Sequence, residues 1–267
     1  MKIILSRKGF DASAGGTPSP VMPDGTMLSM PIPDFYSDDY YDDIGYGDRT
    51  YMDILTELCP RKSFCETCHF DPDLRKDVHL IKTPRSWKPI FGQSDVAERH
   101  LENQGVTVGD IFMFFGWFRQ TEEIDGQLRY TKDAPDAHML YGYLQIGKIV
   151  QGKELEKYDW HPHAYDHPTN TMYIASKKLV IDGEDTGLSG ARTFRYSKKL
   201  VLSAPGYNKR IWKLPKYFQD AYISYHTAGS FTADGYFESA RRGQEFVVSE
   251  NSKVTKWARD IICKHAL

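Results

Sequence analysis

The segment from residue 65 to residue 93, CETCHFDPDLRKDVHLIKTPRSWKPIFGQ, concentrates thiols, imidazoles, carboxylates and a basic turn that carries a tryptophan. Within it, His69, Asp71 and Asp73 occupy alternate positions. Because side chains alternate between the two faces of an extended strand, these three would share one face. Pro72 disfavours a helix here, since it lacks an N–H group and keeps the preceding residue extended. The pattern predicts a metal or proton-transfer cluster; the alternative is a solvated Asp-Pro-Asp turn that caps the next helix.

A second cluster, WHPHAYDH, covers residues 160–167. Its two histidines on either side of Pro162 would also share a face, and His-x-His is a recurrent metal-ligand spacing. Combined with the first cluster they give the composition of a two-histidine, one-carboxylate iron(II) site, in which an arginine, Arg192 or Arg195, would clamp an acidic cosubstrate. The alternative is a neutral pair in a polar loop. The predicted metal ligands are His69, Asp71, His161 and His163.

Three cysteines precede or overlap the first cluster. Cys59, Cys65 and Cys68, followed directly by His69, have the composition of a Cys3His structural zinc site. Only one CxxC pair is present, and a structural zinc would compete with the first cluster for the same imidazole. The expected cofactor is therefore a metal ion, either iron or zinc.

Basic groups are found in two segments that could hold phosphate. Residues 1–5 form an apolar run, typical of a buried strand, which ends in a Gly-containing loop whose backbone N–H groups and cations suit an anion. The turn 82–89, KTPRSWKP, places three cations around a tryptophan, so it could hold a phosphate and stack on a base, or it could be a stiff connector. We predict that the phosphate or substrate site comprises Ser6, Arg7, Lys8, Gly9, Asp11 and Trp87, and that Asp73, Lys82, Arg85 and Lys88 are catalytic.

The composition limits the broad class of protein. The chain has 267 residues, with 34 Lys and Arg against 36 Asp and Glu, so a polyanion site must be a local patch. No run approaches the roughly 18 apolar residues of a membrane span. Neither an export signal nor a cysteine-rich framework is visible, so we expect the cytoplasm. Aromatic residues make up 13%, which suits a β-rich core or base stacking.

The spacing of apolar residues predicts an α+β fold with a mixed or barrel-like β core in one domain, residues 1–267. Long strands are predicted at 111–118 and 140–150, where glycines 142 and 147 indicate bends. Shorter strands are expected at 172–175, 178–181, 193–196, 200–202 and 246–249. Helices are expected at 50–58, at 96–103, at the entry 212–218, and after a cap at Ser252.

Several separated motifs carry a family likeness. ILSRKGFDASAGGTPSP, CHFDPDLR, KTPRSWKPIFGQ, GDIFMFFGWFR, LYGYLQIGKI, HPHA and GQEFVV together resemble the nucleotide-modification-associated domain 3 family of bacterial and phage proteins. The resemblance implies an association with modified nucleic acid bases and attaches no particular reaction. In addition, the middle motifs look like the strand pair of small PUA and EVE barrels, which bind RNA or modified DNA bases.

These observations lead to two functional hypotheses. The first is an enzyme acting on a nucleotide or a nucleic acid base, in which basic groups hold phosphate and the His/Asp set binds a metal or moves protons. The second is a non-catalytic reader of modified bases that relies on aromatic stacking and a basic turn. Bound metal discriminates the two, because only the enzyme needs the His/Asp set.

Overall fold

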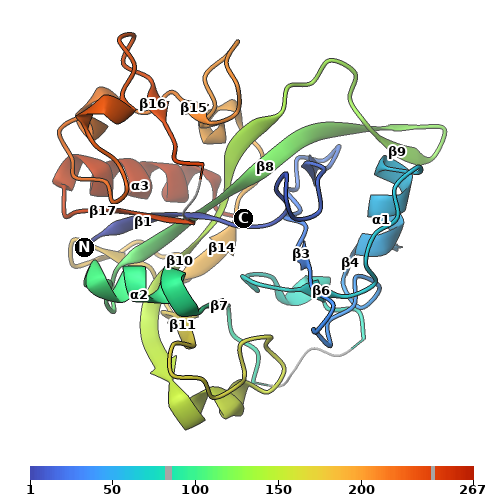
Figure 1. Ribbon diagram of the computed structural model, residues 1–267, viewed down its shortest axis with the longest axis horizontal. Helices are drawn as coiled ribbons and strands as arrows, with labels where there is room; N and C mark the ends of the chain where they lie inside the picture. The colour runs from blue at the N-terminus through green and yellow to red at the C-terminus, as the bar shows by residue number, and fades with distance from the viewer. Residues whose placement is uncertain (82–85, 242–243) are drawn as a thin grey trace.

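A mixed nine-stranded sheet forms the centre of the computed structural model, which describes residues 1–81, 86–241 and 244–267 (Figure 1). Its central strand β8 (Ile111–Ile124) pairs in parallel with β1 (Ile3–Arg7) and antiparallel with β10 (Ala137–Gln151). The α+β prediction with a mixed core is confirmed. The path through the sheet is β17 (Glu245–Val248), β1, β8, β10, β11 (Thr171–Ala175) and β7 (Ile90–Gln93); β14 (Ala191–Thr193) pairs with β10, while β2 (Ser19–Val21) and β9 (Gln127–Tyr130) pair with β8.

The predicted bends in the long strand occur where the glycines are. The pairing register of β10 shifts between Leu140 and Gly142 against β8, and again between Ile146 and Lys148 against β11. A side chain at Gly147 would lie 2.5 Å from the Cα of Ser176, so the close approach requires glycine. These irregularities let one strand pair with β8 over its first half and with β11 over its second.

The sheet curls but does not close into a barrel. No backbone pairing joins its two end strands, β7 and β17, within the described parts of the chain. They nevertheless meet through side chains, because Gln93 at the end of β7 donates from Nε2 to Oε1 of Glu245 on β17 at 2.8 Å. The barrel-like alternative is therefore replaced by an open, curled sheet with a seam between β7 and β17.

Three α-helices occur in the described residues. α1 (Tyr51–Leu58) is capped by Thr50, and α2 (Asp95–Asn103) and α3 (Ser252–His265) pack near the β17–β1 edge (Figure 1). The apolar faces predicted for α1 and α3 are buried, although the cap of α3 is Asn251 rather than Ser252. None of the helices in the described ranges has the length and apolarity needed to cross a bilayer.

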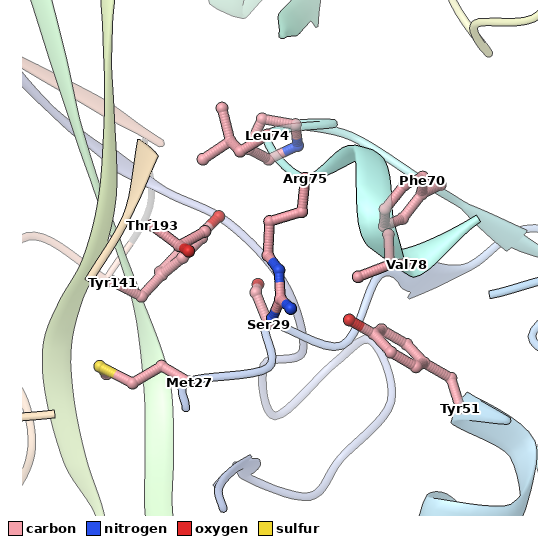
Figure 2. Close-up of a pocket in the computed structure, with 10 residues that line it drawn as sticks. Met27, Ser29, Tyr51, Phe70, Leu74, Arg75, Val78, Tyr141 and Thr193 are labelled. Atoms are coloured by element: carbon pink, nitrogen blue, oxygen red, sulfur yellow. The ribbon is translucent and has the colours of Figure 1, made fainter. Parts of the chain in front are cut away.

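The N-terminal third wraps around the β8–β9 hairpin and builds a core of its own beside the sheet (Figure 1). A small cavity of about 30 Å³ lies between this region and the sheet. Figure 2 shows the guanidinium of Arg75 pointing into it between Ser29 and Tyr51. This cavity is far smaller than the several hundred cubic ångströms of a ligand site. The apolar residues of this core include Phe10, Met30, Tyr41, Ile54 and Leu55.

Short elements complete the fold and correct two predictions. The expected helix entry at 212–218 is instead β15 (Ile211–Trp212) followed by the 3-10 turn η4 (Lys216–Phe218), because Pro215 between them has no N–H to continue a helix. The expected strand at 200–202 is reduced to a single antiparallel bridge between Val201 and Met139, because Leu200 ends the 3-10 turn η3 (Lys198–Leu200). The others are β3 (Ile32–Pro33), β4 (Gly45–Tyr46), β5 (Arg49–Thr50), β6 (Cys68–His69), β12 (Val180–Ile181), β13 (Glu184–Asp185), β16 (Phe237–Glu238), η1 (Lys76–Val78), η2 (Gly152–Tyr158) and η5 (Ala228–Ser230).

Candidate metal centre

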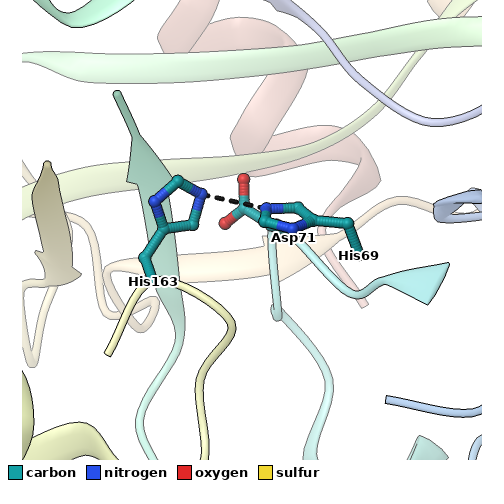
Figure 3. Close-up of side chains that lie close together, drawn as sticks. All are labelled: His69, Asp71 and His163. Atoms are coloured by element: carbon teal, nitrogen blue, oxygen red, sulfur yellow. Dashed lines mark hydrogen bonds between the residues drawn. The ribbon is translucent and has the colours of Figure 1, made fainter. Parts of the chain in front are cut away.

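Three side chains from two distant segments converge beside the seam of the sheet (Figure 3). His69 ends β6, Asp71 follows two residues later, and His163 lies in the loop between η2 and β11. One ligand atom from each lies within 4.8 Å of the other two, and no other group of three such side chains is found in the described ranges. The two predicted clusters therefore meet in space, 94 residues apart in the chain.

The ring of His163 is held in one tautomer. Asn170 donates from its amide nitrogen to the carbonyl oxygens of His163 and Tyr165, both at 2.8 Å, which fixes its amide oxygen as an acceptor. That oxygen lies 2.6 Å from Nδ1 of His163, so Nδ1 carries the proton and donates it. The other ring nitrogen, Nε2, is left with a lone pair that points at His69, as in metal-binding histidines whose second nitrogen donates to the protein.

His69 has a polar neighbour at each ring nitrogen. Its Nδ1 lies 3.4 Å from Oδ2 of Asp34, an ion-pair distance without a hydrogen bond. Its Nε2 lies 3.0 Å from Nε2 of His163, and without a cation this contact is a hydrogen bond in which one ring donates to the other (Figure 3). Two ligands at right angles around an ion, each with a bond of about 2.1 Å, are also about 3 Å apart.

Asp71 supplies a buried carboxylate to the same point. Its Oδ1 accepts from the backbone N–H of Gly92 at 2.7 Å, and Nε2 of His161 lies 3.5 Å from the same oxygen. Among the described residues no hydrogen bond to the second oxygen, Oδ2, is found. One oxygen of the carboxylate is therefore fixed by the protein, and the other remains for a ligand.

The protonation states suit a metal at neutral pH. Burial raises the pKa of Asp71 to about 6, although Lys8 and His69 oppose the rise. Burial lowers the pKa of His69, and it lowers that of His163 to about 4 against the effect of the Asn170 hydrogen bond. At pH 7 the carboxyl is therefore ionised and both imidazoles are neutral, which is the state in which these groups bind metals.

The three side chains line a cavity of about 340 Å³, within the size range of small-molecule sites. The predicted loop after β1 forms the opposite wall with Arg7, Lys8, Gly9 and Asp11. The structure thus brings the predicted phosphate loop and the His/Asp cluster into one site. Residues that the sequence analysis did not assign also line it, namely Ser13, Ile32, Gln93, Ser94, Tyr165 and Gln244.

The loop is built differently from the expected anion nest. Two of its N–H groups are already used, because those of Lys8 and Phe10 donate to the carbonyls of Phe115 and Met30. Lys8 pairs with Glu245 at 3.1 Å and lies over the Phe91 ring, so much of its charge is compensated. Any anion here would meet side-chain cations rather than a row of free N–H groups.

Two other predicted members of this site have structural contacts. Asp11 accepts from the backbone N–H groups of Ser13 and Ala14, which orders the loop. Burial raises the pKa of Asp11, but these hydrogen bonds outweigh it and the net pKa is lowered. Ser6 is fully buried, with its hydroxyl 3.4 Å from Glu245, and does not line the cavity.

Asp73 does not share a face with the first two members of its cluster. Its backbone pairs with Ile90, and its carboxylate accepts from Trp87 at 2.7 Å and lies 2.8 Å from His79. The expected common face is therefore wrong for Asp73, because pairing with β7 turns the chain after Pro72. Trp87 is held by this carboxylate and, like the exposed Lys88, does not line the metal cavity.

His161 lies behind the carboxylate instead of at the metal position. Its Nδ1 accepts from the backbone N–H of His163 at 3.2 Å, which leaves the ring proton on Nε2. That buried Nε2 lies 3.5 Å from Oδ1 of Asp71 and has no hydrogen-bond partner among the described residues, and a nitrogen that carries a proton cannot ligate. Lys82 and Arg85, the remaining predicted catalytic residues, lie outside the described residues.

The three cysteines are not brought together as a zinc site. The sulfur of Cys59 lies 3.3 Å from the Thr17 hydroxyl, and that of Cys65 lies 3.4 Å from Thr67. Cys68 is buried in the N-terminal core, and burial raises its thiol pKa, opposite to what a thiolate ligand needs. Among the described residues, no group of potential metal ligands includes any of these cysteines.

The predicted arginine clamp also lies elsewhere. Arg192 donates to the hydroxyl of Ser189, and Arg195 donates to the carbonyl of Asp24. Neither lines the metal cavity. Cation contacts to a substrate here would come from the loop after β1.

The pKa values give a pH dependence for metal affinity. In the metal-free protein a proton on Asp71 competes with the metal below about pH 6. We expect the logarithm of the apparent affinity to be level above pH 6 and to fall by about one unit per pH unit below it, steepening near pH 4 when His163 also protonates. Calorimetric titration with Zn²⁺ between pH 5 and 8 measures this slope. Two ordinary histidines would instead give a slope of about two starting near pH 6.5.

Comparison with known proteins gives one match. The model of the family described as nucleotide modification associated domain 3 matches residues 2–249 of the 267. No curated protein and no solved structure matches the chain, so the likeness of the middle strands to PUA and EVE barrels remains a prediction. Because the match spans both walls of the cavity, the metal centre and the loop after β1 lie inside the family domain. The chain belongs to the nucleotide modification associated domain 3 family.

Proposed function

We propose that this protein is a metal-dependent enzyme that modifies a nucleotide or a base in a nucleic acid. His69, Asp71 and His163 would hold a divalent ion, and the cavity beside them would receive the base. The observation that carries the proposal is the convergence of these three side chains, with one ligand atom of each within 4.8 Å of the other two. The family's association with nucleotide modification supplies the substrate class.

The donor set favours a metal with open positions. Two imidazoles and one carboxylate give three ligands, as in non-haem iron(II) sites and in catalytic zinc sites. Such an ion, when bound, would activate oxygen or a water molecule. The protein's own residues would orient it: Asn170 fixes the tautomer of His163, Asp34 lies beside Nδ1 of His69, and the Gly92 N–H holds the carboxylate.

The cavity also has features that suit a nucleotide. Arg7 and Lys8 provide positive charge on the wall opposite the histidines. Tyr165 is 47% exposed and its ring stacks roughly parallel to that of His163, so a base entering the cavity would meet a flat aromatic surface. Phe35 and Tyr36, which follow Asp34 in the chain, are 82% and 99% exposed.

The reader hypothesis receives less support. The aromatic residues of the central strand, including Phe112, Phe114, Phe115 and Phe118, are fully buried in the core and cannot stack on bases. None of the described residues of the predicted basic turn, 86–89, lines the cavity.

The test combines metal analysis with a modification assay. Protein purified anaerobically without chelators should contain close to one equivalent of iron or zinc by plasma mass spectrometry. Apoprotein and reconstituted protein are then incubated with DNA, RNA and free nucleotides, with oxygen present or absent, and the nucleosides are analysed by mass spectrometry. A modified nucleoside that depends on metal is expected. Equal modification by the apoprotein, or none by protein with a full metal site, would show the proposal to be wrong.

A further inference from the structure

A second cavity, of about 480 Å³, adjoins the metal cavity. The two share Arg7, Asp11 and Ser13, so the loop after β1 forms a common wall between them. Each cavity alone is large enough for a ligand of nucleotide size. The proposed metal site uses none of the residues that line only the second cavity.

The lining of the second cavity is strongly cationic. Lys209, Arg210 and Arg241 join Arg7 around it, and Asp11 is the one acidic residue among its described lining residues. Arg210 pairs with Glu238 at 2.7 Å outside this lining. For Lys209 and Arg241 no carboxylate partner is found in the described parts of the chain. Positive charge therefore exceeds negative charge in a concave site, which suits phosphate.

An aromatic wall accompanies these cations. The Nζ atom of Lys209 lies 3.9 Å from the centre of the Trp117 ring, so the indole and the ammonium group are presented together. The indole nitrogen of Trp117 is buried and has no hydrogen-bond acceptor among the described residues. An aromatic surface combined with cations is the usual means by which proteins bind single-stranded nucleic acids.

We propose that the second cavity binds the nucleotide next to the target in a single-stranded nucleic acid, with the linking phosphate near Arg7. This inference rests on the proposed function, since it takes the target base to occupy the metal cavity. The two cavities are concave and share the loop after β1, whereas a base in a duplex must leave its stack to reach such a site. A strand with unstacked bases fits both compartments, and a mononucleotide fills only one.

Binding of a labelled single-stranded oligonucleotide of about ten nucleotides, measured by fluorescence anisotropy over a range of salt concentrations, tests this inference. The variant is Lys209→Ala with Arg241→Ala. The matched control is Lys153→Ala with Lys253→Ala, which removes the same charge from exposed positions outside both cavities. Loss of two phosphate contacts should reduce the slope of log affinity against log salt by about 1.4 and weaken binding about tenfold or more near 0.1 M salt.

Parallel measurements separate this inference from the function on which it rests. Chelator is present in the binding assay, so the result does not require a metal centre, and metal content is measured on the same variants. Unchanged affinity for a nucleoside monophosphate and unchanged metal content are expected. A variant that matches its control, or one that loses affinity for a nucleoside triphosphate as much as for the oligonucleotide, would overturn the strand proposal. A wild type without metal would instead contradict the metal enzyme while leaving the strand site testable.

Discussion

Replacing His163 with Ala, or Asp71 with Asn, should reduce metal affinity by at least about 100-fold and abolish modification activity. Loss of a supporting partner around a metal already costs 10–100-fold, and these residues are the proposed ligands themselves. Asp71→Asn keeps the side-chain shape and an acceptor for the Gly92 N–H group, so its effect reports the lost charge rather than a lost fold. Competition with a chromophoric chelator measures the affinity, and plasma mass spectrometry measures the bound metal.

The matched control is His167→Ala, which removes an exposed histidine from the same loop. Its metal affinity should equal that of the wild type. Circular dichroism melting of all three variants shows whether they remain folded. Full metal content in folded His163→Ala would rule out this centre, and equal loss in His167→Ala would mean that the loop as a whole, and not one imidazole, decides binding.

Gly92→Ala should disrupt the metal centre without changing any ligand. A Cβ at this position would lie 2.2 Å from two ring atoms of His163, far inside any tolerated contact, so the imidazole must move. The displaced ring loses its position relative to His69, and the Gly92 N–H that holds Asp71 shifts with the backbone. We expect metal affinity to fall about 10–100-fold, with a stability loss of about 1–3 kcal/mol from overpacking.

Gly229→Ala provides the comparison, since its nearest neighbour would be 3.6 Å away and its φ is not in the left-handed region. It should leave both metal affinity and stability close to the wild-type values. A Gly92→Ala protein with normal metal affinity would mean that His163 is not positioned as described. If Gly92→Ala lost stability but kept its metal affinity, the glycine would be needed for packing at β7 and not for the position of His163.

The local patterns predicted much of this site. Alternation placed His69 and Asp71 on one side of an extended segment, and the His-x-His spacing identified His163, because both depend only on neighbours in the chain. Asp73 fits the same pattern but turns away, since its direction is set by pairing with Ile90 on β7. Strand pairing between distant segments cannot be predicted from the local alternation of side chains.

The partners that make the histidines ligands were not predictable in the same way. Asp34 lies in an irregular segment with many similar aspartates, and Asn170 has no distinguishing pattern around it. Asp34 approaches His69, and Asn170 binds His163, only in the folded chain. The fold also has a predictable and an unpredictable part. Helix faces and the bends at glycines depend on neighbouring residues and were predicted. The position of β1 between β8 and β17 depends on residues up to about 240 positions apart and was not.

The position of β1 also determines when the site can form during synthesis. β1 is made first, but its neighbours are β8 from the middle of the chain and β17 near the end. Lys8 is paired by Glu245, and the seam residue Gln93 also requires that carboxylate. A chain growing on the ribosome therefore carries the cation and the ligands for most of its synthesis before the strand that organises them exists, and long-range pairings of this kind form slowly. Chains that do not yet include β17 should consequently lack the assembled pocket.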